Sequence, residues 1–262
     1  MKRIGIIGGL SFESTTHYYE RINREINKRL GGTSHASADM VLRSVNFEEY
    51  YNLMRDGHWD TIAKMLSDEA LTLRLKNKCD YVAIASNTMH KVADQVGGPH
   101  QVEEWPNSYI TINIPLIHIG DCIVNKCLDE KMQLVTLIGT RTTLTESFMK
   151  DRLRRGGRLE VVDMFDGAEV DQIDRIIFDE LCHGKVTVES RDKIISIINR
   201  ANERCTNRYG EGFGGVILGC TELEMLFDDL IESGIELDNG HRIKFINSTQ
   251  VHIDKIVKLC LS

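Results

Sequence analysis

The chain has 262 residues, of which 42% are hydrophobic and 27% charged, and its formal net charge is −7. This composition is typical of a soluble globular protein that is long enough to bury an ordinary core, or two compact halves of about 130 residues each. The acidic balance disfavours a nucleic-acid surface, which needs a concentrated excess of Lys and Arg, and it favours a small-molecule ligand.

The chain opens with an apolar, glycine-rich stretch. This stretch is too short and too rich in glycine for a signal peptide, and no apolar run in the sequence is long enough to span a bilayer. We therefore expect a cytosolic protein without a membrane partner. The pattern predicts a strand at residues 4–7, a turn at residues 8–11 and a helix over residues 14–30, with Ser14 or Thr15 as its N-cap.

The rest of the first half alternates strands with helices. A strand at residues 40–45 leads through a polar turn to a helix over residues 59–76. A second apolar strand at residues 81–85 ends in Ser86-Asn87-Thr88, which opens a further helix. A short strand at residues 115–118 ends this half. Before it comes a predicted loop, which contains Gly97, Gly98, Pro99, Trp105 and Pro106.

The second half repeats this order at a nearly constant spacing. Gly139 follows Gly8 by 131 residues, Cys220 follows Ser86 by 134, and Asn247 follows His118 by 129. Each pair marks the end of a predicted strand. The strands of the second half are predicted at residues 134–138, 159–162, 215–218 and 244–247, with helices at residues 170–182 and 190–208.

Strands that alternate with helices of this length imply right-handed crossovers and parallel sheets. The predicted fold class is therefore α/β, with two pseudo-symmetric domains that each hold a four-stranded parallel sheet flanked by helices. In such a pair, equivalent strand ends can face each other across an interdomain cleft. That arrangement would set Ser86 opposite Cys220 and place the functional site in the cleft.

Cys220 is the strongest chemical candidate. The seven cysteines are an odd number without the spacing of a metal site or a disulfide framework, so most are expected to be reduced and structural. Cys220 differs because it follows a strand, beside a helix N-terminus, where the thiolate form is favoured. Two such groups on opposite sides of a carbon can remove a proton from one face and return one to the other. The N–H groups and hydroxyls of Asn87, Thr88 and Thr221 would then bind a carboxylate.

Four motifs together resemble the aspartate/glutamate racemases, which are amino-acid racemases that work without pyridoxal phosphate. They are residues 8–15, Ser86-Asn87-Thr88-Met89-His90, Gly139-Thr140-Arg141 and Gly219-Cys220-Thr221-Glu222, and the similarity covers nearly the whole chain. The resemblance implies two pseudo-symmetric domains, no cofactor, no metal and a homodimer. It also implies that a C-terminal helix packs on the first half, so the expected domains are residues 1–118 plus 248–262, and residues 119–247.

Ser86 departs from the family pattern, which has a cysteine in each turn. A thiol with a pKa near 8.5 costs about 2 kcal/mol to ionise at neutral pH, whereas a hydroxyl at about pKa 13 costs roughly 8 kcal/mol. Ser86 is therefore a poor general base, although it can relay a proton or hold a water. Some relatives carry threonine there and favour one enantiomer, and by that resemblance Cys220 takes the proton from the L-isomer. Alternatively, Ser86 is an engineered replacement of cysteine.

The residues that bind the rest of the substrate are less well defined. The expected binding set is Leu10, Arg55, Asn87, Thr88 and Thr221, with Arg141 and Lys185 as further candidates for a second carboxylate. A generic surface cation is the competing interpretation for each basic residue. His90 is expected to cap or pack in its helix. His118 stands at a strand end from which it could line the cleft, but a structural role is favoured for it. Compared with relatives, Met54 replaces a glutamine, Cys182 a lysine and Asn247 an aspartate.

Two other functions fit the same residues. A single-cysteine decarboxylase of substituted malonates, or a maleate-type isomerase, would use one thiol to deliver a proton to one face. A catalytically silent protein would keep the carboxylate site and bind a dicarboxylate. No dinucleotide fingerprint, phosphate-binding loop or metal-ligand spacing competes with these interpretations.

Overall fold

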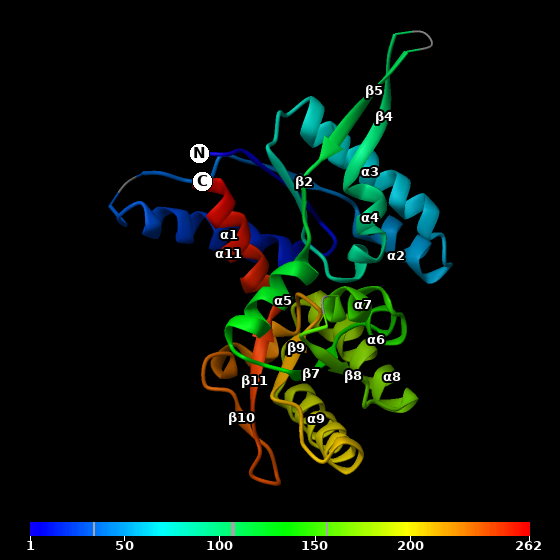
Figure 1. The fold of residues 1–262 in the computed structure, drawn as a ribbon, viewed down its shortest axis with the longest axis vertical. Helices are drawn as coiled ribbons and strands as arrows, with labels where there is room; N and C mark the ends of the chain where they lie inside the picture. Colours follow the sequence, from blue (N-terminus) through cyan, green and yellow to red (C-terminus); the bar gives the residue numbers. More distant parts are fainter. Residues whose placement is uncertain (34, 106–107, 156) are drawn as a thin grey trace. The chain divides into compact units, whose positions relative to one another are not determined.

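The computed structural model describes residues 1–33, 35–105, 108–155 and 157–262. The chain divides into two compact units, residues 1–118 with 252–262 and residues 119–251. Each unit is built on one mainly parallel sheet with helices around it (Figure 1), which confirms the predicted α/β class. Within the described part of the chain, no helix is both long and apolar enough to cross a membrane.

The sheet of the first unit has four parallel strands. Their order is β2 (Met40–Ser44), β1 (Ile4–Gly8), β3 (Tyr81–Ile84) and β6 (Leu116–Ile117). Every residue of β1 is buried, as expected of a central parallel strand with an unbroken apolar run. Because β1 and β3 are parallel, with Ile7 paired to Ile84, the turns that follow them lie at the same edge of the sheet.

The helices of the first unit differ from the prediction at several points, including α1 and α2. They are α1 (Phe12–Arg29), α2 (Phe47–Arg55), α3 (Trp59–Leu75), α4 (Ala93–Val96) and the later part of α11 (Ser248–Cys260). The predicted N-cap of α1 is wrong: Ser11 caps the helix by accepting the Ser14 N–H, so Ser14 and Thr15 lie inside the first turn. α2 occupies the segment predicted as a polar turn, and it buries only Tyr50.

The predicted loop after α4 is an antiparallel hairpin. β4 (Gly98–Trp105) pairs with β5 (Ser108–Ile114), from Gly98 opposite Ile114. The sequence of β5 alternates Ile with polar residues, which is a strand pattern, but the neighbouring Gly97-Gly98-Pro99 favours a loop. Pro106, which the prediction also placed in that loop, lies outside the described residues.

The second unit has the four predicted parallel strands and one more. The order is β10 (Ile235–Glu236), β11 (Arg242–Asn247), β9 (Gly215–Leu218), β7 (Leu134–Ile138) and β8 (Glu160–Val162). β10 runs antiparallel to β11 at the edge and was not predicted, because a two-residue strand leaves no pattern in a sequence. The carboxyl ends of β7, β9 and β11 lie at one edge, with Leu218 paired to both Ile138 and Asn247.

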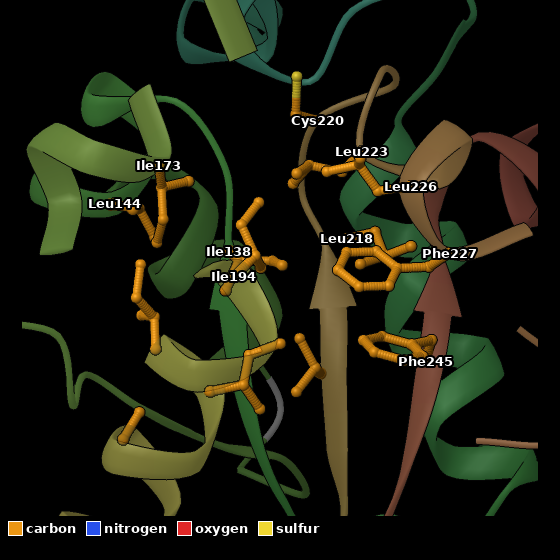
Figure 2. Close-up of a cluster of buried hydrophobic side chains, with 14 of the residues drawn as sticks. Ile138, Leu144, Ile173, Ile194, Leu218, Cys220, Leu223, Leu226, Phe227 and Phe245 are labelled. Carbon is orange, nitrogen blue, oxygen red and sulfur yellow. The ribbon is translucent and has the colours of Figure 1, made fainter. Parts of the chain in front are cut away.

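Helices surround this second sheet. They are α5 (Ile119–Asp129), α6 (Arg141–Thr145), α7 (Phe148–Arg154), α8 (Gly167–Arg175), α9 (Val188–Tyr209) and α10 (Glu224–Phe227). The segment predicted as one helix over residues 170–182 is helical but changes type along its length. α8 is followed by a π-helical turn (Ile176–Glu180) and then by a 3-10 turn (Leu181–His183). A core of apolar side chains lies between the sheet and α9 (Figure 2), in which the Phe227 and Phe245 rings stack with centroids 4.7 Å apart.

α11 links the two units. Its first turn remains with the second unit, where the Ser248 hydroxyl donates to the Leu218 carbonyl at 2.5 Å and the Gln250 N–H donates to Asn247 Oδ1 at 3.0 Å. From His252 onward the helix belongs to the first unit. There it lies beside α1 (Figure 1), and the Tyr18 hydroxyl contacts His252 Nδ1 at 2.8 Å.

Glycine is required at positions where the end of a strand packs closely against the backbone of another segment. A Cβ at Gly139 would lie 2.8 Å from the Gly219 carbonyl oxygen, and the Gly219 N–H donates to the Ile138 carbonyl at 2.6 Å. In the first unit Gly9 has a φ of +79°, and a Cβ there would lie 2.2 Å from the Val45 carbonyl oxygen. Both motifs therefore need glycine for the close approach of two backbones.

Gly9→Ala should destabilise the protein more than Gly57→Ala, which is a matched control. Gly57 has nearly the same φ, +77°, but no atom lies within 4 Å of its added Cβ. The left-handed backbone alone should cost about 1–2 kcal/mol of unfolding free energy at Gly57. The overlap with Val45 should add about 1–3 kcal/mol at Gly9. Urea denaturation of both variants measures the difference, and equal costs would contradict the close packing of this turn.

Candidate active site

The first half-site comprises residues 8–11 and 86–90, at the carboxyl ends of β1 and β3. The Gly9 N–H donates to Thr15 Oγ1 at 2.7 Å, and the Thr15 hydroxyl donates to the Ser11 carbonyl at the same distance. The Leu10 side chain packs in the core of the unit, beside residues such as Ile7 and Tyr50. The side chain of Leu10 is therefore structural, and only its backbone is left as a candidate for contact with a ligand.

Ser86, Asn87 and Thr88 are all buried at the end of β3. The predicted helix after them is shorter than expected, because a 3-10 turn (Thr88–Val92) comes first and α4 has only four residues. The Met89 N–H approaches Ser86 Oγ at 3.5 Å, the outer limit of a hydrogen bond. The hydroxyl of Ser86 thus sits where a turn begins, as its sequence position indicates.

His90 packs against this turn, as predicted. Its Nδ1 lies 2.6 Å from the Ser86 carbonyl oxygen, and because a carbonyl only accepts, Nδ1 carries the hydrogen. The His118 ring, at the end of β6, contacts the His90 ring edge-on with centroids 4.6 Å apart. His90 therefore acts on the backbone of Ser86 rather than on its hydroxyl.

The second half-site comprises residues 139–141, 219–222 and 247, at the carboxyl ends of β7, β9 and β11. Cys220 follows β9 and is 6% exposed. Figure 2 shows it at the edge of the core, with its sulfur directed away from the other labelled side chains. The Cys220 Sγ–H donates to Glu222 Oε2 at 2.9 Å, and the Thr221 hydroxyl donates to the same oxygen at 2.8 Å.

These surroundings raise the pKa of the Cys220 thiol well above its ordinary value. Burial is the main cause, and the negative charge of Glu222 is the second. The expectation that a helix N-terminus favours the thiolate is wrong for this structure. The helix that follows, α10, has only four residues and begins at Glu224, while the Glu222 carboxylate lies against the sulfur. At neutral pH the resting group is therefore the neutral thiol.

Two buried acidic residues near Cys220 were given no role in the sequence analysis. Glu222 binds the thiol, and Glu224 accepts the Asn247 Nδ2–H at 2.6 Å. An aspartate at position 247 would place a second carboxylate against Glu224, so the asparagine suits its acidic neighbour. The sequence did contain a signal for this pair. Two Glu residues stand in the otherwise apolar stretch after β9, and carboxyl groups that are buried need partners.

The predicted basic contacts each have a protein neighbour or face solvent. Arg55 ends α2, and its Nε donates to Asp56 Oδ1 at 3.2 Å. Arg141 forms an ion pair with Asp171. Lys185 is exposed. None of these contacts joins a predicted basic residue to the Ser86 or Cys220 turn.

Glu222→Gln should lower the pKa of the Cys220 thiol, because it removes the adjacent charge while leaving the burial unchanged. The pH profile of iodoacetamide alkylation, followed at the Cys220 peptide by mass spectrometry, measures this shift. Glu224→Gln is the matched control, since it neutralises a buried carboxyl that contacts Asn247 instead. A wild-type midpoint below pH 9, or no downward shift in Glu222→Gln, would show that the carboxylate does not govern the thiol.

Comparisons with known proteins place the chain in one family. Residues 7–256 match the family model Asp/Glu/Hydantoin racemase. Among solved structures, a Yersinia pestis protein described as a candidate Asp/Glu racemase is 30% identical over 100% of both chains, with a TM-score of 0.77. An aspartate racemase homologue from Pyrococcus horikoshii OT3 is also 30% identical over 100% of both chains, with a TM-score of 0.72.

A more distant structure shares the fold. The aspartate racemase of Picrophilus torridus is 16% identical, with 99% of this chain and 94% of that chain covered and a TM-score of 0.62. The family match and the full-length similarity at 30% identity confirm the resemblance inferred from the four motifs. The chain belongs to the Asp/Glu/Hydantoin racemase family, and it is an isomerase of the amino-acid racemase class.

Proposed function

We propose that the protein racemises an acidic amino acid, aspartate or glutamate, without a cofactor. Cys220 is the main acid/base, and Ser86 takes the place of the second cysteine at the same α-carbon. The observation that carries this proposal is the contact of the Cys220 thiol with the Glu222 carboxylate at the end of β9, in a chain of the racemase family.

The contact with Glu222 gives the thiol proton a destination. Cys220 can remove an α-proton only as a thiolate, and its own proton already points at Glu222 Oε2. Transfer of that proton to Glu222 leaves the thiolate, which takes the α-proton while the C–H electron pair remains on the substrate as a carbanion. Cys220 is then a neutral thiol and can return a proton to the same face.

Ser86 serves the opposite face as a proton relay. The hydroxyl costs roughly 8 kcal/mol to ionise at neutral pH against about 2 kcal/mol for a thiol, so it does not act as the base. Its hydroxyl gives a proton to the carbanion and takes one back from a water molecule. The hydroxide that remains is neutralised by the proton held on Glu222, which returns Glu222 to its carboxylate form while Cys220 stays a neutral thiol. Inversion is then slower than proton exchange on the Cys220 side, which favours reaction of the L-isomer.

Backbone and hydroxyl groups would bind the substrate carboxylates. Asn87, Thr88 and the backbone of Leu10 supply donors from the first half-site, and Thr221 supplies one from the second. Arg55 is the proposed partner of the side-chain carboxylate, since its side chain is 62% exposed and its pairing with Asp56 is a surface ion pair worth about 0–1 kcal/mol. We further propose that the protein works as a homodimer.

A second function is favoured by the raised pKa of Cys220. A neutral thiol is a proton donor, so a decarboxylase or isomerase of a small dicarboxylic acid could use Cys220 to protonate one face of a carbanion. This reaction needs no second acid/base residue, so it is compatible with a hydroxyl rather than a thiol at position 86. It differs from racemisation in leaving a single stereoisomer of the product.

Racemisation is tested by α-proton exchange in D2O, followed by NMR with L- and D-aspartate and glutamate. The wild-type protein should exchange the α-proton of an L-isomer, and Cys220→Ala should lose exchange and inversion together. Ser86→Cys should raise inversion at least about tenfold, because a thiol ionises more readily than a hydroxyl. Cys205→Ala, at a buried cysteine in α9, is the matched control. Absence of exchange in both the wild type and Ser86→Cys would remove the racemase proposal.

The alternative is tested with substituted malonates and cis-dicarboxylates in D2O. A one-sided proton donor should release product that carries deuterium on a single face, and Cys220→Ala should abolish it. Turnover of these acids without exchange on any amino acid would favour the second function over racemisation. Chiral analysis of the labelled product makes the distinction.

A further inference from the structure

Three histidine rings pack beneath the Ser86 turn in the first unit. His90 comes from the 3-10 turn after β3, His118 from the end of β6 and His252 from α11. The His90 ring lies edge-on to both others, with centroids 4.6 Å from His118 and 5.9 Å from His252. The proposed reaction uses none of these rings, although they adjoin one of its two acid/base residues.

His252 is held from two sides. Its Nε2 lies 2.9 Å from the Ile117 carbonyl oxygen, which requires the hydrogen on Nε2, and its Nδ1 therefore accepts the Tyr18 hydroxyl at 2.8 Å. Complete burial, together with the charge that His90 can carry, lowers the pKa of His252 to about 3. His252 is thus a neutral ring held in place, and its contact with the His90 ring is T-shaped.

His90 is in turn bonded to the backbone of the reactive serine. The 2.6 Å contact from its Nδ1–H to the Ser86 carbonyl is far shorter than the 3.5 Å approach of the Met89 N–H to Ser86 Oγ. The direction of the Ser86 hydroxyl depends on how its backbone is oriented, and the bond from His90 is made to that backbone. Loss of this bond would turn the carbonyl and move the hydroxyl with it.

We propose that His90 is a positioning residue for the Ser86 step, and that it acts by holding the Ser86 carbonyl while His252 and Tyr18 hold its ring in place. The proposal rests on the proposed racemisation, and it concerns only the face of the substrate that Ser86 serves. A misplaced hydroxyl would leave the carbanion to be reprotonated by Cys220. Exchange with retention would then continue while inversion falls.

The test is the ratio of α-proton exchange with retention to inversion for the L-isomer in D2O. His90→Leu should raise this ratio by about tenfold to a hundredfold, as expected when a reacting group is misplaced by about 1 Å. His90→Asn should restore it, because the Asn amide can donate from nearly the same position as Nδ1. Tyr18→Phe, which removes only the hydroxyl that holds His252, should raise the ratio in the same direction and covers the case in which His90→Leu fails to fold.

His100→Leu is the matched control, because His100 also contacts the carbonyl four residues before it, at 2.8 Å, but at Val96 rather than at a reactive turn. An unchanged ratio in the folded His90→Leu and Tyr18→Phe proteins would overturn the proposal, and so would an equal rise in His100→Leu. Both outcomes are measured against an active wild-type protein, so they would leave the proposed function in place. A wild type without exchange or inversion would overturn the proposed function and this inference with it.

Discussion

Parallel pairing of fully buried strands is the constraint on which the rest of the structure depends. β1 with β3, and β9 with β7 and β11, run in the same direction, so the polar turns after them are gathered at one edge of each sheet. Those turns can pack closely only because glycine replaces a side chain at the approach points, as at Gly139 beside Gly219. Strand register therefore determines where the candidate site residues of each unit lie.

The Ser86 turn and the Cys220 turn each follow a buried parallel strand of their own unit, but their neighbouring side chains differ in chemistry. The Cys220 thiol donates a hydrogen bond to Glu222, and burial together with the Glu222 charge raises the pKa of that thiol. The carbonyl of Ser86 instead accepts a hydrogen bond from His90, and the Ser86 hydroxyl oxygen is approached by the Met89 N–H. Such an asymmetry suits an enzyme in which one side exchanges protons readily and the other limits inversion.

The parts of the fold that could be predicted were those with strong local patterns. Buried parallel strands read as short apolar runs, and residues 134–138 and 215–218 follow that rule. The motifs at their ends were enough to infer the family. By contrast, α2 buries a single tyrosine and β10 has two residues, so neither leaves a periodic signal.

The side-chain environment of the site could not be predicted in the same way. Sequence placed Cys220 at a strand end, but whether its neighbour is a helix N-terminus or a carboxylate depends on how residues 221–224 fold. Burial is the main cause of the raised pKa of the Cys220 thiol, and Glu222, which lies against the sulfur before the short α10, adds to it. The shift therefore has the opposite direction to the one expected from the sequence. His252 joins the Ser86 turn from 166 residues away in the chain, a contact that only the tertiary fold creates.

The most direct test of two-sided proton transfer is a crystal structure with bound aspartate or glutamate. The account predicts that Cys220 Sγ and Ser86 Oγ both lie about 3–4 Å from the α-carbon, on opposite faces, or that one ordered water bridges Ser86 to it. An amino acid bound with its α-carbon beyond the reach of either group, or with both groups on one face, would contradict it.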